Sequence, residues 1–110
     1  MISIIYTTFK TEHDAKELAM RILHEKLAFC VNMIPKITSF YISETAIQNS
    51  EEVVLIVKTM EKYEDELIRF ISKHHPYDIP FVAKIASISN DKCNDLYVSW
   101  LKTLELSNIS

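Results

Sequence analysis

The sequence contains no glycine at all. Glycine is the usual residue where the backbone needs a positive φ or must lie close against a ligand. The chain therefore lacks the glycine-rich loops that hold phosphates and dinucleotides, and it lacks the G-x-S-x-G turn of serine hydrolases. Any backbone position with a positive φ must be held by Asn, Asp or another strained residue.

Cysteine is also scarce, since the chain has only Cys30 and Cys93. Neither belongs to a C-x-x-C pair, which argues against a structural zinc site or a thioredoxin-like motif. An unpaired cysteine in an apolar stretch, such as Cys30, is usually a small buried hydrophobe, and it serves as a soft-metal ligand only with a partner nearby. Cys93 is expected to be inert. We expect a cytoplasmic protein with reduced thiols.

Long apolar runs and a strong charge of one sign are missing as well. The longest unbroken apolar run is 53–57, far short of the ~20 residues that a membrane span needs. The amino terminus shows no basic segment and no cleavage site, so we expect no signal peptide and no membrane association. The 12 basic residues are scattered along a chain of net charge −3, which gives little support for nucleic-acid binding.

The residues that are present predict one domain over 1–110. Strand-like composition marks 2–8, 28–34 with a continuation at 37–42 beyond Pro35, 52–59 and 81–88, and the polar stretch 43–50 predicts a hairpin loop. Helical spacing of apolar residues predicts a helix that follows a cap at Thr11, a second that ends near Lys73, and a third capped by Asn90 or Asp91. The order β-α-β-β-α-β with an additional C-terminal helix predicts an α+β, ferredoxin-like sandwich.

This architecture leaves one face of the sheet without helices. A half-solvated antiparallel strand alternates apolar and polar residues, but 53–57 is apolar throughout and so is much of 81–83. Something must therefore cover the second face. The sequence favours a second copy of the chain, because large exposed apolar patches are rare on monomers. The alternative is that the terminal helix covers this face within one chain.

The segment His74-His75-Pro76-Tyr77-Asp78-Ile79-Pro80 allows two interpretations. Imidazole is a common ligand for copper, zinc and nickel, so the two histidines are candidate metal ligands. A third or fourth ligand would have to come from Cys30, Asp78 or another subunit. The other interpretation is a turn that ends a helix, because Pro76 disfavours helix at His75. The spacing itself favours the turn. No arrangement of nucleophile and base stands out, so we expect no enzyme.

Several stretches taken together resemble the CutA family of divalent-cation-tolerance proteins. They follow one another over nearly the whole chain: EKLAFCVNMIP (25–35), SFY (39–41), EEVVLIVKT (51–59), HHPYDIP (74–80) and YVSWL (97–101). The resemblance implies a ferredoxin-like subunit in a tight homotrimer, an architecture shared with the nitrogen-regulatory trimeric signalling proteins. It also implies tolerance of copper and other divalent cations, with Cu(II) or a related ion as a possible ligand and no organic cofactor.

The resemblance further implies a cleft between subunits. The residues expected to line this cleft are Asn32, Tyr41, Glu52, Lys58, Tyr77 and Trp100. The chain departs from the family pattern in two places: Ser43 and Thr45 replace the Trp and Gly of Y-x-W-x-G, and Phe81 replaces the Glu that usually follows Pro80. A carboxylate ligand at position 81 is therefore excluded.

Two functional hypotheses follow. The first is a homotrimer that binds a soft or borderline divalent cation through His74, His75 and Cys30, with copper as the leading candidate. The second is a trimeric signalling or scaffold module that binds a small anionic ligand or a partner protein in the cleft. In that case Lys58, Tyr41 and Tyr77 would supply the contacts.

Overall fold

The fold is known from a computed structural model, which describes residues 1–104. The elements, in chain order, are β1 (Ile2–Phe9), α1 (Glu12–His24), β2 (Cys30–Ser43), β3 (Ala46–Met60), the short 3-10 helix η1 (Glu61–Tyr63), α2 (Glu64–His74), β4 (Val82–Ile88), a second 3-10 helix η2 (Asn90–Lys92) and α3 (Asp95–Leu101). No helix within this part of the chain is long and apolar enough to cross a membrane.

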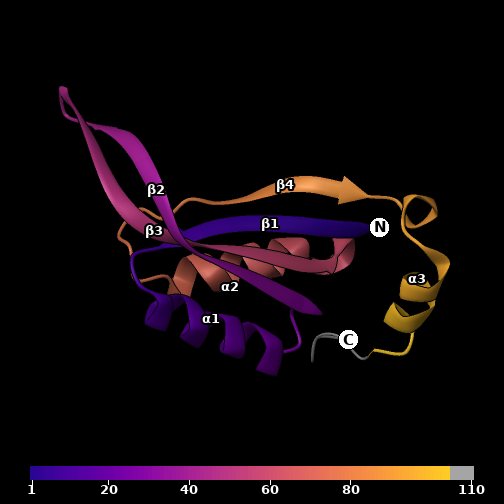
Figure 1. Ribbon diagram of the computed structural model, residues 1–110. Coiled ribbons are helices and arrows are strands. Elements are labelled where there is room, and N and C mark those ends of the chain that lie inside the picture. The colour runs from indigo at the N-terminus through magenta and orange to yellow at the C-terminus, as the bar shows by residue number, and fades with distance from the viewer. Residues whose placement is uncertain (105–110) are drawn as a thin grey trace.

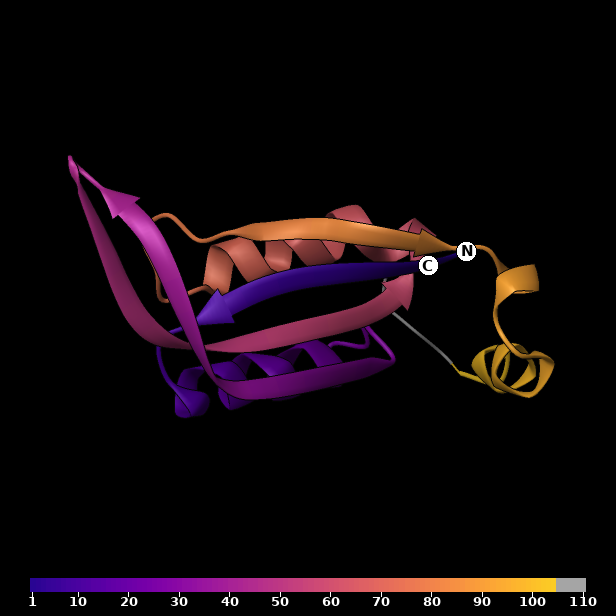
Figure 2. The same ribbon diagram turned by 45° about the horizontal axis from the view of Figure 1, so that its top comes forward.

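The four strands form one antiparallel sheet in the order β2-β3-β1-β4. Both long helices, α1 and α2, pack on the same face of this sheet (Figures 1 and 2). This is the ferredoxin-like α+β arrangement, as the order of predicted strands and helices required.

The core lies between the sheet and these two helices. Successive side chains of a strand point to opposite faces, and alternate residues of the two central strands are buried against the helices. On the sheet side the fully buried members include Ile5, Phe9, Leu55 and Val57, and on the helix side Ile22, Leu67 and Ile71. Burying one such side chain contributes roughly 1.5–3 kcal/mol, so the two central strands and the two helices are held firmly together.

Helix α1 begins and ends as its sequence indicates. The Thr11 side chain accepts a hydrogen bond from the Asp14 backbone N–H at 3.1 Å, which satisfies one free donor of the first turn. At the other end Lys26 takes a positive φ of 56°. The Leu27 N–H bonds back to the Ile22 carbonyl at 3.1 Å, as in helix ends that normally use glycine. The predicted cap at Thr11 is therefore confirmed.

The predicted loop at 43–50 is wrong. Strands β2 and β3 stay paired until Ser43 faces Ala46, so only Glu44 and Thr45 form the turn. The paired segments Ile37–Ser43 and Ala46–Glu52, called the arm below, extend away from the rest of the sheet (Figures 1 and 2). The polar residues misled the prediction because both faces of the arm lie outside the core. Pro35 and Lys36 form a bulge at its base, since the register shifts between Ile34 and Ile37.

Helix α3 is the predicted third helix, but it begins later in the chain than predicted. It begins at Asp95 with Asn94 in the capping position, and no side chain caps it. The predicted caps Asn90 and Asp91 lie in η2 instead, because extended backbone at Cys93 interrupts the helical path. In both views α3 lies beyond the end of the sheet (Figures 1 and 2). It leaves uncovered the sheet face opposite α1 and α2, called the open face below.

Candidate functional site

A hollow of about 390 Å³ lies where the arm leaves the sheet. Two residues come from β2 and two from β3, at alternate positions that share one face. Thr8 lies next to the last residue of β1, and the loop before β4 contributes the other three. The lining residues are Thr8, Ser39, Tyr41, Ser50, Glu52, Tyr77, Ile79 and Phe81. This set is called the Glu52 hollow below. It holds one carboxylate, five hydroxyl groups and three aromatic rings, and none of the eight residues is basic.

His75 fixes the loop that closes the hollow. The residue is only 8% exposed, and its ring stacks on Phe9 with centroids 4.3 Å apart. The Tyr77 N–H donates to Nδ1 at 3.1 Å, so Nε2 carries the proton and donates to the Thr8 carbonyl at 2.8 Å. Both ring nitrogens are engaged, and the interpretation of this segment as a rigid turn agrees with these contacts.

The charge state of His75 follows from this position. Burial lowers the pKa of His75 below its usual 6.5, although the Thr8 carbonyl and the charge of Glu52 act in the opposite direction. The ring is therefore a neutral imidazole at neutral pH. Its function in the fold is to hold Tyr77 two residues further on.

Glu52 is the one formal charge in the lining of the hollow. Burial raises its pKa, but hydrogen bonds to the side chains of Ser39, Tyr77 and Thr8 lower it more, and the net effect is a pKa below the usual 4.5. The hydrogen bond from the Tyr77 hydroxyl measures 2.6 Å. Burial and this carboxylate together raise the pKa of Tyr77, so the phenol stays a donor. Glu52 is therefore an ionised carboxylate held by neutral hydroxyl groups.

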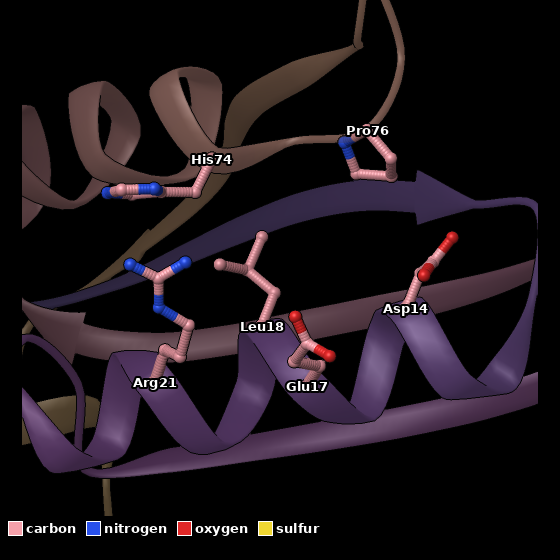
Figure 3. Close-up of a pocket in the computed structure, with 6 residues that line it drawn as sticks. All are labelled: Asp14, Glu17, Leu18, Arg21, His74 and Pro76. Carbon is pink, nitrogen blue, oxygen red and sulfur yellow. The ribbon is translucent and has the colours of Figure 1, made fainter.

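His74 lies in a different environment from His75. It lines a smaller hollow of about 80 Å³ between α1 and the end of α2, where Arg21 rises from α1 toward it (Figure 3). Partial burial, followed by the charges of Arg21 and Lys73, lowers the pKa of His74. Asp14 and Glu17 also line this hollow, but within residues 1–104 no three side chains of metal-binding type converge.

The remaining predicted residues lie elsewhere. Cys30 pairs with Lys58 and Asn32 with Ile56, near the start of β2. Lys58 is six residues from Glu52 along β3, which corresponds to roughly 20 Å. Trp100 belongs to α3, where it packs against Tyr97 with ring centroids 5.3 Å apart. Of the predicted cleft set, the structure brings together Tyr41, Glu52 and Tyr77.

The predicted metal ligands are not assembled within one chain. His74 faces α1 and His75 has no free ring nitrogen. Cys30, at the far end of the β2–β3 ladder, completes no cluster with either of them. A metal site built from these three residues stays a prediction.

Sequence reasoning missed five lining residues of the hollow. Thr8, Ser39, Ser50 and Ile79 gave no signal of their own, while Phe81 was noted only for the carboxylate that it replaces. A correct register would have found the two serines, because Ser39 faces Ser50 across the ladder and each lies two residues from a predicted cleft residue. The false loop at 43–50 hid that register.

Comparison with known proteins gives a consistent assignment. The model of a family described as "CutA1 divalent ion tolerance protein" matches residues 3–104. The divalent-cation tolerance protein CutA of Yersinia pestis is 35% identical over 98 residues, which cover 89% of this chain and 80% of that protein. The chloroplastic CutA of Arabidopsis thaliana is 35% identical over 99 residues, which cover 90% of this chain. The chain spans only 53% of that plant relative's length.

Solved structures agree with the sequence relatives. The crystal structure of CutA1 from Oryza sativa has a TM-score of 0.85 and 35% identity, and the match covers 99% of this chain and 95% of that one. CutA1 from Ehrlichia chaffeensis gives a TM-score of 0.84 and 33% identity, covering 93% and 92% of the two chains. The protein with the Glu52 hollow at the base of its arm therefore belongs to the CutA1 divalent ion tolerance family.

Proposed function

We propose that this chain acts in divalent-cation tolerance as a homotrimer whose Glu52 hollow binds a cation. The observation that carries the proposal is the Glu52 carboxylate, which accepts a hydrogen bond from the Tyr77 hydroxyl at 2.6 Å in a hollow whose eight lining residues include no basic side chain. A negative charge that the lining leaves uncompensated attracts a positively charged ligand. The family is described by tolerance of divalent ions and not by a reaction, so binding, and not catalysis, is the proposed activity.

Cu(II) or a related divalent ion is the first ligand to test. Copper stands at the top of the affinity order for divalent ions at nitrogen and oxygen sites. Within one chain the hollow supplies the carboxylate of Glu52 and hydroxyl oxygens, which is too few strong ligands to hold the ion alone. A divalent metal bound here would take further ligands from solvent or from a neighbouring subunit.

The proposed homotrimer is supported by the open face of the sheet. Ile4, Tyr6 and Ile56 lie on it, because their neighbours along the strands point into the core. Ile34 on the same sheet is 43% exposed. Neither α1, α2 nor α3 covers this face (Figures 1 and 2), so a second copy of the chain is its natural cover. The number three comes from the family resemblance.

An anionic ligand for the same hollow has less support. The negative charge of Glu52 would repel an anion in this hollow. Lys58, the lysine proposed to hold the anion, lies roughly 20 Å away along β3. Tyr41 and Tyr77, the other two contacts of that hypothesis, surround the carboxylate instead. The contacts within residues 1–104 thus favour a cation.

Calorimetric titration with Cu(II) and Zn(II) at neutral pH tests the proposal on the wild type, Glu52→Gln and His74→Ala. We expect Glu52→Gln to weaken the affinity by roughly 10- to 100-fold, as the loss of a group at a metal site does, and His74→Ala to leave it unchanged. His74→Ala is a suitable control because its side chain lines the other hollow. Loss of binding in His74→Ala with none in Glu52→Gln would place the metal at the end of α2 and contradict the proposal.

A further inference from the structure

We propose that the Glu52 hollow takes an organic ammonium ion, with a methylated quaternary ammonium head as its best ligand. The inference rests on the proposed function, because it assumes that this hollow binds a cation. It goes further in naming the chemical class of that cation. Three features of the hollow support it: the number of charges, the kind of side chain around them and the size of the space.

The charge of the hollow matches a monocation better than a bare divalent metal. Glu52 supplies one negative charge, and the Tyr77 hydroxyl already donates to it at 2.6 Å. A divalent metal ion needs several strong ligands at short distance, and no three metal-binding side chains converge within residues 1–104. One carboxylate is enough for an ammonium group, whose charge is spread over its substituents.

Aromatic rings make up much of the wall. Tyr41 comes from the arm, while Tyr77 and Phe81 come from the loop before β4. The faces of such rings attract cations, and sets of them form the cages that bind quaternary ammonium groups. Ile79 adds apolar surface beside them. Methyl groups on nitrogen would contact these walls, whereas a hydrated metal ion would gain nothing from them.

Phe81 distinguishes this chain from the family pattern. The resemblance places a carboxylate at this position, and here a phenyl ring stands in its place, 60% exposed in the isolated chain. The ring packs edge-on against Tyr6 with centroids 6.2 Å apart, and this contact holds it in the lining of the hollow. The exchange removes one metal-binding oxygen donor and adds one cation-binding ring.

The volume of the Glu52 hollow also favours an organic ammonium ion over a bare metal ion. A volume of about 390 Å³ lies within the range of small-molecule sites, roughly 300–1,000 Å³. A bare metal ion would leave most of this space filled with water. An ammonium ion with a short organic chain would occupy it and contact the carboxylate and the rings together.

The test compares choline with 3,3-dimethylbutan-1-ol, which has the same shape without the charge. Each is titrated into the full chain, and binding is followed by calorimetry and by the NMR resonances of Glu52 and Phe81. We expect choline to bind and the neutral alcohol to bind at least ~10-fold more weakly, since only choline gains the cation–π and carboxylate attraction.

Variants assign the binding to the hollow. Phe81→Leu keeps an apolar side chain but removes the ring, and we expect it to weaken choline binding roughly 5- to 30-fold. Glu52→Gln should weaken choline binding as well. Phe40→Leu is the matched control, because Phe40 lies on the arm outside the hollow and is 73% exposed. Phe81→Glu should gain affinity for divalent metal, because it adds a carboxylate oxygen donor to the lining.

The outcomes separate this inference from the proposed function. Equal binding of choline and the neutral alcohol, or choline binding that Phe81→Leu leaves unchanged, overturns the ammonium site. Metal binding that depends on Glu52 without any choline binding overturns it too and leaves the proposed function standing. If neither choline nor metal binds, both the inference and the proposed function fail.

Discussion

At the scale of single residues, the backbone of this glycine-free chain takes a positive φ at three places within residues 1–104. They are Lys26 after α1, Lys36 in the bulge and Glu44 in the hairpin turn, with φ between 55° and 59°. A side chain with a Cβ atom costs about 1–2 kcal/mol in this region. The lack of glycine in the sequence predicted that strained residues would hold such positions, and the structure confirms it, although none of the three is Asn or Asp.

Lys26→Gly is therefore expected to stabilise the fold. The free energy of unfolding should rise by about 1 kcal/mol, because glycine accepts the backbone conformation after the helix without strain. Urea denaturation measures the change. Lys16→Gly, inside α1, is the control and should lower the stability by about 1 kcal/mol. A loss of stability in both variants would show that the backbone at Lys26 is not strained.

His75 makes the stability depend on pH. Its folded pKa lies below the usual 6.5, so the unfolded chain binds a proton on His75 more readily than the folded chain does. Stability from this residue is therefore complete above pH 6.5 and falls as the pH drops below that value. Thermal unfolding of wild type and His75→Gln across this range measures the effect.

The expected result is a smaller loss of stability on acidification in His75→Gln than in the wild type, because glutamine does not titrate and its amide can still donate to the Thr8 carbonyl. His24→Gln serves as the control, since His24 ends α1 with its side chain exposed. An unchanged acid-induced loss in His75→Gln would mean that His75 is not held neutral by burial.

At the scale of elements, the sequence predicted the strands and helices of the core and the strand 37–42 of the arm, but it failed at 43–50 and at the start of α3. Strand-like composition identified β1, and the helical spacing of apolar residues identified α1 and α2, because each of these helices buries one face. The segment 43–50 buries neither face in a single chain, so its polar sequence resembled a loop. The same failure hid two of the eight residues that line the Glu52 hollow, because Ser39 and Ser50 are neighbours only through the pairing of β2 with β3.

The cap of α1 gives a prediction at this scale. Thr11→Ala removes the hydroxyl that accepts from the Asp14 N–H, and we expect a loss of about 1 kcal/mol in the free energy of unfolding. Thr11→Ser should restore most of it, because serine can make the same bond. Thr38→Ala, on the exposed arm, is the matched control, and a loss of the same size there would contradict the capping role.

At the scale of the whole molecule, the open face has to be explained. The apolar run 53–57 predicted that both faces of β3 are covered, and the structure shows helices on only one of them (Figure 1). Resemblance to the family supplied the number of subunits, which no pattern in a single chain could give. The position of α3 could not be predicted either, because its short amphipathic sequence fits several surfaces.

Ile56→Lys tests the proposed assembly. A charged lysine on the open face should dissociate the homotrimer, because the ammonium group would be buried without a partner at the interface. Analytical ultracentrifugation should give three times the 12.8 kDa of the chain for the wild type and a smaller mass for the variant. Met20→Lys, on an exposed position of α1, should stay trimeric. A monomeric wild type would contradict the proposal.

The most direct test of the account is the pKa of Glu52, because the proposed cation site requires this carboxylate to be ionised and held by hydroxyl groups. An NMR titration of its side-chain carboxyl resonance measures it in the wild type and in Tyr77→Phe. The account predicts a pKa below 4.5 in the wild type and a higher one in Tyr77→Phe, which lacks the donor at 2.6 Å. A wild-type pKa above 4.5, unchanged in Tyr77→Phe, would contradict it.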